Sequence, residues 1–271
     1  MEETKHQKWK TPVWKVTDAQ AKRILRVSEA RALIANININ DQGMIKKMES
    51  TKSDIVVWLQ ALLFTGMRFA ELYKLHGHPE LFEANGSIRL DKGIFYDTGK
   101  QRQQARERVV MLSDAGRPII EKFFATRKLK VIVNSQTPQY DIHRVLDAML
   151  KASAERIGLQ SRQFSRTIKK AVIDADGFAR RNDDGKVVTK KVQIPQETTG
   201  VMVRTFRSTW ESWLVSTRGT DEFTLYRIHN SMGHNRETAM KHYLASQFDE
   251  DDITDMLKVT EGFGIVPERQ A

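Results

Sequence analysis

The stretch Thr65-Gly66-Met67-Arg68-Phe69-Ala70-Glu71-Leu72 joins two predicted helices through a glycine and places an arginine just after it. The apolar run before it, residues 52–64, has helical spacing, starts at a Ser53 or Asp54 cap and ends where Gly66 can adopt the left-handed C-cap conformation. Glu71 follows Arg68 by three residues and therefore shares its helical face. The pattern predicts a short helix over residues 68–75 whose first arginine is held by a carboxylate.

The rest of the chain is mostly helical in pattern. Apolar residues recur at helical spacing in 17–35 (with Thr17 or Asp18 as N-cap), 117–127, 140–157, 201–216, 223–232, 236–246 and 251–259. Three short runs rich in β-branched or aromatic residues, 87–90, 93–96 and 108–112, are separated by turn formers and predict a small antiparallel sheet. The predicted fold class is α+β, mainly α-helical, with a small antiparallel β-sheet.

Composition limits the classes of function. The 271 residues carry a formal net charge of +10, which favours a polyanionic partner. The chain has no cysteine, so disulfide scaffolds, zinc fingers, thiol nucleophiles and iron–sulfur sites are excluded. Its longest apolar run, 55–64, is far shorter than a bilayer span. We therefore expect a cytoplasmic protein without a membrane partner, associated with the nucleoid if the source is prokaryotic.

Two later stretches complete a set of residues suited to phosphate chemistry. Arg204-Thr205-Phe206-Arg207 places two guanidinium groups one helical turn apart, and each can donate two hydrogen bonds to a phosphate. Gly233-His234 puts a histidine at a helix start, and Tyr243 follows nine residues later. Together with Arg68 these residues supply phosphate clamps, a proton donor and an oxygen nucleophile.

These motifs resemble those of the tyrosine recombinase family, the phage-integrase class. The stretch from Thr65 to Leu72 resembles the family's first box, which implies that Arg68 binds the scissile phosphate and that Glu71 supports the site. Arg207 is similar to the second catalytic arginine. Met232-Gly233-His234 followed by Tyr243 is similar to the family's Leu-Gly-His box and its nucleophilic tyrosine, including the step of nine residues.

Two further positions follow from the resemblance. The family carries a catalytic lysine in a β-hairpin turn, and Lys100 in Thr98-Gly99-Lys100 is the candidate, although the connection 101–107 is longer than usual. Arg204 stands where the family usually has histidine. A guanidinium can donate to a phosphoryl oxygen but cannot act as a base near neutral pH. Arg204 is therefore assigned to transition-state charge stabilisation, and the group that deprotonates Tyr243 stays unassigned.

A basic insertion at residues 161–192 precedes the pair Arg204 and Arg207. It holds nine Lys or Arg against four Asp, around the turn signal Asn182-Asp183-Asp184-Gly185. We expect its second half to form a basic β-hairpin that contacts the phosphates of double-stranded DNA. The candidate DNA-binding residues are Lys169, Lys170, Arg180, Arg181, Lys186, Lys190 and Lys191, with Arg102 and Arg106 beside Lys100.

The expected organisation has three parts. Residues 1–50 form a basic segment and the first helix, residues 51–248 form the catalytic domain, and residues 249–271 form a C-terminal helix that contacts a neighbouring protomer. Only 67 residues precede Arg68, which leaves too little chain for the helical clamp that family members place before the catalytic domain. We expect either a minimal recombinase or a fragment whose clamp lies elsewhere. The resemblance implies a tetramer on DNA during synapsis.

The predicted function is that of a site-specific DNA recombinase or integrase that cleaves and rejoins strands through a 3′-phosphotyrosine, with no metal, cofactor or ATP. Tyr243 is the candidate nucleophile because the other tyrosines lack a Gly-His pair nine residues before them: Tyr73, Tyr96, Tyr140 and Tyr226. Telomere resolution and type IB topoisomerase activity share this chemistry and remain alternatives. The arginine at position 204 and the missing clamp also leave open a catalytically silent DNA-binding relative.

Overall fold

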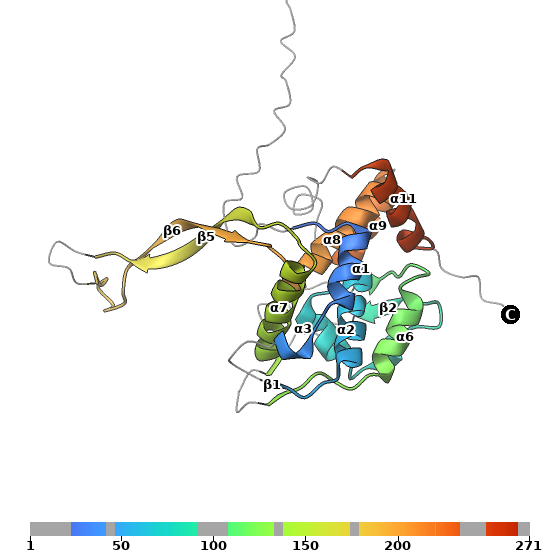
Figure 1. Ribbon diagram of the computed structural model, residues 1–271, viewed down its shortest axis with the longest axis horizontal. Coiled ribbons are helices and arrows are strands. Elements are labelled where there is room, and N and C mark those ends of the chain that lie inside the picture. Colours follow the sequence, from blue (N-terminus) through green and yellow to red (C-terminus); the bar gives the residue numbers. More distant parts are fainter. Residues whose placement is uncertain are drawn as a thin grey trace, which may run out of the picture. The chain divides into compact units, whose positions relative to one another are not determined.

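The computed structural model describes residues 23–41, 47–90, 108–132, 138–173, 179–219, 221–233 and 248–264 (Figure 1). The described residues divide into two compact units. One unit is the hairpin within Ser161–Gly200, and the other contains the remaining described residues, before and after it. The larger unit is mainly helical with short antiparallel strand pairs, as the sequence predicts.

The helical unit is built from eight described helices, two 3-10 turns and four short strands. They are α1 (Val27–Ala35), η1 (Ile39–Asp41), β1 (Lys47–Met48), α2 (Lys52–Thr65), α3 (Phe69–Leu75), η2 (Pro79–Leu81), β2 (Ile88–Leu90), β3 (Arg108–Val110), α6 (Arg117–Ala125), β4 (Val131–Ile132), α7 (Pro138–Arg156), α8 (Val203–Arg218), α9 (Glu222–Met232) and α11 (Glu250–Thr260). Most predicted helices are confirmed within a few residues.

Helices α2 and α8 form the centre of this unit. Helix α2 packs on α8 and α6, and α8 packs in turn on α9 and α11. Trp58 of α2 and Trp210 and Trp213 of α8 are fully or almost fully buried. Burying side chains of this size supplies much of the hydrophobic stabilisation. The core therefore fixes the two helices that position the motif arginines.

Helix α1 begins later than predicted. Helical spacing from residue 17 onward suggested one long helix, but residues 23–26 are not helical and α1 begins at Val27. The backbone of Leu25 instead bonds to α8: its N–H donates to Thr209 Oγ1 at 3.1 Å, and its carbonyl accepts from Trp213 Nε1 at 2.9 Å. These tertiary hydrogen bonds outweigh local helix propensity. The proposed caps Thr17 and Asp18 lie outside the described residues.

Helix α2 has the predicted bounds to within one residue, but its N-cap is a different residue. Thr51, rather than Ser53 or Asp54, is the N-cap, and its side chain accepts a hydrogen bond from the Asp54 N–H. Gly66 is the C-cap with φ 59°, the left-handed conformation that glycine adopts without a Cβ penalty. Helix α3 starts three residues later, so the chain turns sharply between them.

The predicted small sheet is present as an antiparallel pair. Strand β2 pairs with β3 in the register Ile88↔Val110, Arg89↔Val109 and Leu90↔Arg108. The third predicted strand, 93–96, lies outside the described residues. A second pair, β1 with β4, joins Lys47 to Ile132 and Met48 to Val131 and was not predicted.

The hairpin unit is longer than predicted. Strands β5 (Arg162–Ala171) and β6 (Thr189–Thr198) pair antiparallel along their whole length, so the first half of the insertion is also a strand. The predicted turn at residues 182–185 exists: the Gly185 N–H donates to the Asn182 carbonyl at 2.8 Å, and Gly185 has φ 74°. This turn joins the isolated bridge Arg181↔Val187 rather than the two long strands.

Helix α11 packs on its own chain. It contacts α8 and α1, and the Glu261 carbonyl accepts a hydrogen bond from the Asp114 N–H at 2.8 Å. Asp249 caps the helix by accepting from the Asp252 N–H. The predicted contact of residues 249–271 with a second protomer stays a prediction. No single described helix is long and apolar enough to cross a bilayer; α2 and α3 meet such a test only jointly, across a 115° bend.

Candidate functional site

The turn between α2 and α3 places Arg68 as the sequence predicts. Arg68 is the N-cap of α3, and its backbone N–H donates to Glu71 Oε2 at 2.8 Å. Its guanidinium Nη1 donates to Glu71 Oε1 at 3.0 Å. The Arg68 side chain is 55% exposed, whereas that of Glu71 is 6% exposed. A buried carboxylate thus holds an arginine that still faces solvent.

Arg207 reaches the same turn from α8. Its Nη1 donates to the Gly66 carbonyl at 2.7 Å, and its Nη2 donates to the Met232 carbonyl. Gly66 ends α2 and Met232 is the last residue of α9, so one buried guanidinium joins the ends of two helices. The structure therefore brings together Arg68, Glu71 and Arg207, and it places Gly233 beside them.

The electrostatics of the site centre on Glu71. Burial raises the pKa of this carboxyl. The charge and hydrogen bonds of Arg108, followed by the charges of Arg68 and Arg207, lower the pKa by more than burial raises it. The net result is a pKa of about 2. Glu71 is therefore ionised at neutral pH and serves as the counter-ion of three arginines.

Arg108 is a further member of this cluster, although it is not among the predicted site residues. It opens β3, its side chain is 4% exposed, and its Nη2 lies 2.8 Å from Glu71 Oε2. Its Nη1 donates to Glu71 Oε1 at 3.0 Å, which makes the pair bidentate. The available signal was an arginine at a position that the strand pattern turns toward the core, opposite the buried Leu90.

Arg204 lies in the first turn of α8, one turn before Arg207. Its charge lowers the pKa of Asp147, although burial dominates and leaves that pKa raised. Asp147 Oδ1 also accepts a hydrogen bond from the Val203 N–H at 2.7 Å, and Asp147 Oδ2 lies 3.4 Å from His143 Nδ1. Asp147 of α7 therefore anchors the start of the helix that carries both arginines.

Several predicted site residues lie outside the described part of the chain: Lys100, Arg102, Arg106, His234 and Tyr243. Their predicted roles stay predictions. Gly233, which directly precedes His234 in the sequence, caps α9 with φ 72°.

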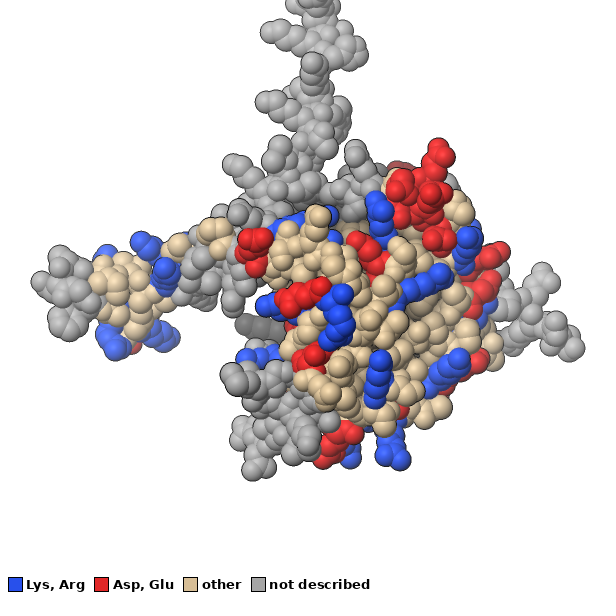
Figure 2. Space-filling view, in the orientation of Figure 1, with Lys and Arg blue, Asp and Glu red and all other residues tan. Residues whose placement is uncertain are grey.

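The predicted DNA-binding side chains of the hairpin unit are exposed. Lys170, Arg180, Arg181, Lys186, Lys190 and Lys191 all face solvent, while of Lys169 only the backbone position, opposite Lys191, is described. Figure 2 shows Lys and Arg side chains gathered on the described part of this hairpin. The register sets Lys170 directly opposite Lys190, and like charges in such cross-strand pairs repel.

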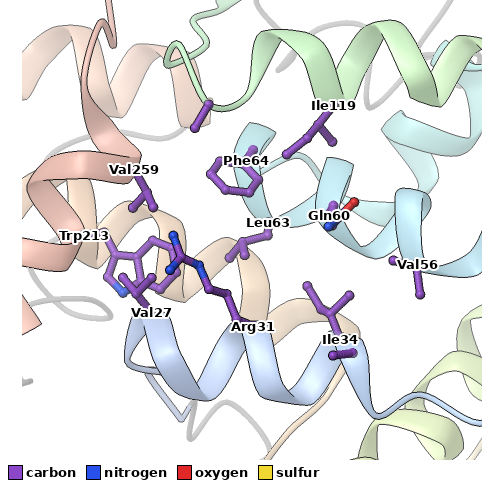
Figure 3. Close-up of a pocket in the computed structure, with 12 residues that line it drawn as sticks. Val27, Arg31, Ile34, Val56, Gln60, Leu63, Phe64, Ile119, Trp213 and Val259 are labelled. Atoms are coloured by element: carbon purple, nitrogen blue, oxygen red, sulfur yellow. The ribbon is translucent and has the colours of Figure 1, made fainter.

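A pocket of about 360 Å³ lies elsewhere in the helical unit. Side chains from α1, α2, α6, α8 and α11 line it, most of them apolar, among them Val27, Leu63, Phe64 and Trp213 (Figure 3). None of the motif residues lines it. Among the described residues, no group of three or more His, Asp or Glu side chains could hold a metal ion.

Comparison with known proteins gives a weak structural likeness. No family model matches the chain, and no curated protein matches it. Among solved structures, a crystal structure of XerA recombinase resembles it with 14% sequence identity and a TM-score of 0.42, over 87% of this chain and 64% of that one. The chain thus spans less than two thirds of the length of that recombinase. A likeness of this size is a resemblance and assigns no activity to this chain.

Proposed function

We propose that this protein is a tyrosine recombinase that cleaves and rejoins DNA strands through a 3′-phosphotyrosine at Tyr243. The observation that carries the proposal is that Arg68 and Arg207 meet at one turn, because Arg207 Nη1 donates to the carbonyl of Gly66, two residues before Arg68. The two arginines come from motifs far apart in the sequence, yet both lower the pKa of the same carboxyl. A phosphodiester in a substitution reaction requires several cationic donors, and these two arginines supply two of them at one turn.

The proposed reaction conserves the phosphodiester energy. Tyr243 loses its phenolic proton to a base that stays unassigned, and its Oη attacks the scissile phosphorus in line. The bond from Oη to phosphorus forms as the bond to the 5′ oxygen breaks, and the leaving oxygen takes a proton from Lys100. Arg68, Arg207 and Arg204 neutralise the charge that develops on the phosphoryl oxygens. His234 donates a hydrogen bond to the same group. Attack by the 5′ hydroxyl of a partner strand reverses the step and yields strand exchange, in a tetramer on DNA.

The hairpin unit supplies the proposed grip on the double helix. Its exposed Lys and Arg contact backbone phosphates, so binding there is sequence-independent and depends on salt. Arg102 and Arg106 add contacts beside Lys100. The chain works without metal or ATP in this account.

The test uses a pool of short duplexes with randomised centres, each with one nick, because a nick lets the 5′ fragment diffuse away and traps the covalent intermediate. We expect wild type to give an adduct that survives denaturing electrophoresis and Tyr243→Phe to give none. Tyr226→Phe is the matched control, since Tyr226 is 67% exposed on α9 and lies outside the motifs. An adduct of equal yield with Tyr243→Phe would refute the proposal.

Arg204 favours a second candidate, a DNA-binding relative that does not cleave. A guanidinium replaces the usual histidine there and cannot accept the tyrosine proton. DNA binding by wild type without any adduct would select this candidate. Among cleaving enzymes, recombined products would distinguish a recombinase from a type IB topoisomerase, which relaxes supercoils, and from a telomere resolvase, which forms hairpin ends.

A further inference from the structure

Arg108 is an arginine in the interior of the helical unit, on the short strand β3. Its side chain is almost fully buried, and the strand pairs with β2 so that Arg108 stands opposite Leu90. A charged group in such a place is costly unless its partners are well placed. Nothing in strand formation requires it, since the equivalent inward positions Ile88, Leu90 and Val110 are apolar.

Among the described residues, two arginines donate hydrogen bonds to Glu71. It accepts hydrogen bonds from the Arg68 backbone N–H and Nη1, and from Nη1 and Nη2 of Arg108. These four hydrogen bonds use both carboxylate oxygens, two bonds to each. The orientation of Glu71, and through it that of Arg68, is therefore fixed from β3.

The same guanidinium lies against Gly233. A Cβ built on Gly233 would come within 2.2 Å of Arg108 Nη1 and 2.7 Å of Cζ. A side chain at position 233 would require the Arg108 guanidinium to shift, and the hydrogen bonds of Arg108 with Glu71 oppose that shift. Position 233 therefore favours glycine for its neighbour as well as for its φ of 72°. The residue that follows β3 also joins this strand to α9, because the Met111 N–H donates to Ser231 Oγ at 3.0 Å.

We propose that Arg108 is a positioning residue that sets the end of α9 against the Arg68–Glu71 pair. Arg207 holds the Met232 carbonyl, and Arg108 packs on the next residue, Gly233. Contacts with Arg207 and, through Arg108 and Glu71, with Arg68 therefore fix the position at which the chain leaves α9. The segment that follows carries His234 and Tyr243. The consequence for catalysis rests on the proposed function, whereas the coupling between Arg108 and Gly233 does not.

The first experiment measures that coupling without any activity. Gly233→Ala is made in wild type and in Arg108→Ala, and the shift in thermal midpoint is compared. We expect Gly233→Ala to lower the midpoint by about 5 °C or more in wild type and clearly less in Arg108→Ala, where only the φ cost remains. Arg108→Gln, also too short to reach Gly233, replaces Arg108→Ala if that variant does not fold.

A second glycine provides the control for this cycle. Gly158 has φ 73°, and a Cβ there would meet nothing within 4 Å. Gly158→Ala should therefore shift the midpoint equally in the wild-type and Arg108 backgrounds. Equal shifts for Gly233→Ala in both backgrounds would overturn the proposal.

The second experiment measures cleavage against pH at saturating nicked DNA. Three arginines, Arg108, Arg68 and Arg207, face Glu71, and Arg108 has the largest lowering effect on its pKa. Arg108→Gln should slow cleavage by about 100-fold, as misplacement of reacting groups does, and leave the DNA dissociation constant within about 3-fold. It should also move the acid limb of the profile to higher pH.

Two variants complete that test. The double variant Arg108→Gln, Glu71→Gln should lack the displaced acid limb, since no carboxyl remains to titrate. Arg89→Lys, on the exposed face of β2, should match wild type. An Arg108→Gln rate reduced equally at every pH would show a general structural role and overturn the proposal. If wild type forms no adduct, the proposed function fails, and the thermal cycle alone decides the role of Arg108.

Discussion

Arg207 Nη1 donates a hydrogen bond to the backbone carbonyl of Gly66 at 2.7 Å, which ties helix α8 to the turn that presents Arg68. The same guanidinium also holds the Met232 carbonyl. Two carbonyl acceptors therefore fix Arg207 before any substrate arrives. Preorganised donors of this kind need little rearrangement when negative charge develops.

Replacing Gly66 should be costly for two separable reasons. Gly66→Ala combines φ 59° with a Cβ only 2.5 Å from Met232 Cε and 3.0 Å from Trp210 Cδ1. We expect a loss of about 2–4 kcal/mol in the free energy of unfolding, measured by urea denaturation. Gly158→Ala, which has similar backbone strain but open space around it, should cost about 1 kcal/mol. Equal losses in the two variants would contradict the packing described here.

The stability of the protein should depend on the ionisation of Glu71. Its pKa falls from 4.5 to about 2 on folding, so the stabilisation is fully present above pH 4.5 and is lost as the pH falls toward 2. Glu71→Gln should therefore lower the free energy of unfolding by about 3 kcal/mol at pH 7, and the gap to wild type should narrow on acidification. Urea titrations at several pH values measure both. A gap independent of pH would show that Glu71 does not titrate as described.

The facing lysines of the hairpin should have opposite effects on DNA binding and on stability. Lys170→Gln with Lys190→Gln removes a cross-strand repulsion, so the free protein should become slightly more stable. DNA affinity should fall, and the slope of log affinity against log salt should decrease by about 1 for each phosphate that the variant no longer neutralises. Lys258→Gln on α11, whose lysine pairs with Asp255, is the control and should leave the slope unchanged. An unchanged slope in the hairpin variant would remove this pair from the DNA interface.

The buried pair between α8 and α9 should matter more than its surface counterpart. Glu211 is fully buried and its Oε1 lies 3.4 Å from Nδ1 of the almost buried His229. His229→Leu should lower the free energy of unfolding by about 2 kcal/mol or more, because breaking a buried pair leaves a charge poorly compensated. His78→Leu, which breaks the exposed pair with Glu80, should leave stability unchanged in the same urea titration. A small effect at His229 would mean that the other interactions of Glu211 suffice.

Local patterns in the sequence predicted most of the helices because amphipathic spacing and end signals act over a few residues. The Gly66 cap, the Arg68–Glu71 pair and the turn at residues 182–185 all follow from such local rules. The late start of α1 was missed because Leu25 bonds to side chains of α8, which no local pattern encodes. The two-residue strands β1 and β4 are likewise set by their pairing alone.

The sequence predicted the site residues that belong to sequence motifs, but it did not predict those that only tertiary packing brings to the site. Arg68, Glu71 and Arg207 follow from motifs, and the structure brings them together. The contacts of Arg108 with Glu71 and Gly233 are set by packing, where β3 meets α3 and α9. The long hairpin was underestimated because its first strand, 162–171, is mostly polar and lacks the regular alternation of apolar and polar residues that predicts a strand.

The most direct test of the central claim is to locate the covalent bond. The adduct on nicked DNA is digested with nuclease and protease, and the modified peptide is sequenced by mass spectrometry. We expect a nucleotide joined through its 3′ phosphate to Tyr243 and to no other tyrosine. A nucleotide on Tyr73, Tyr96, Tyr140 or Tyr226, or one joined through a 5′ phosphate, would contradict it.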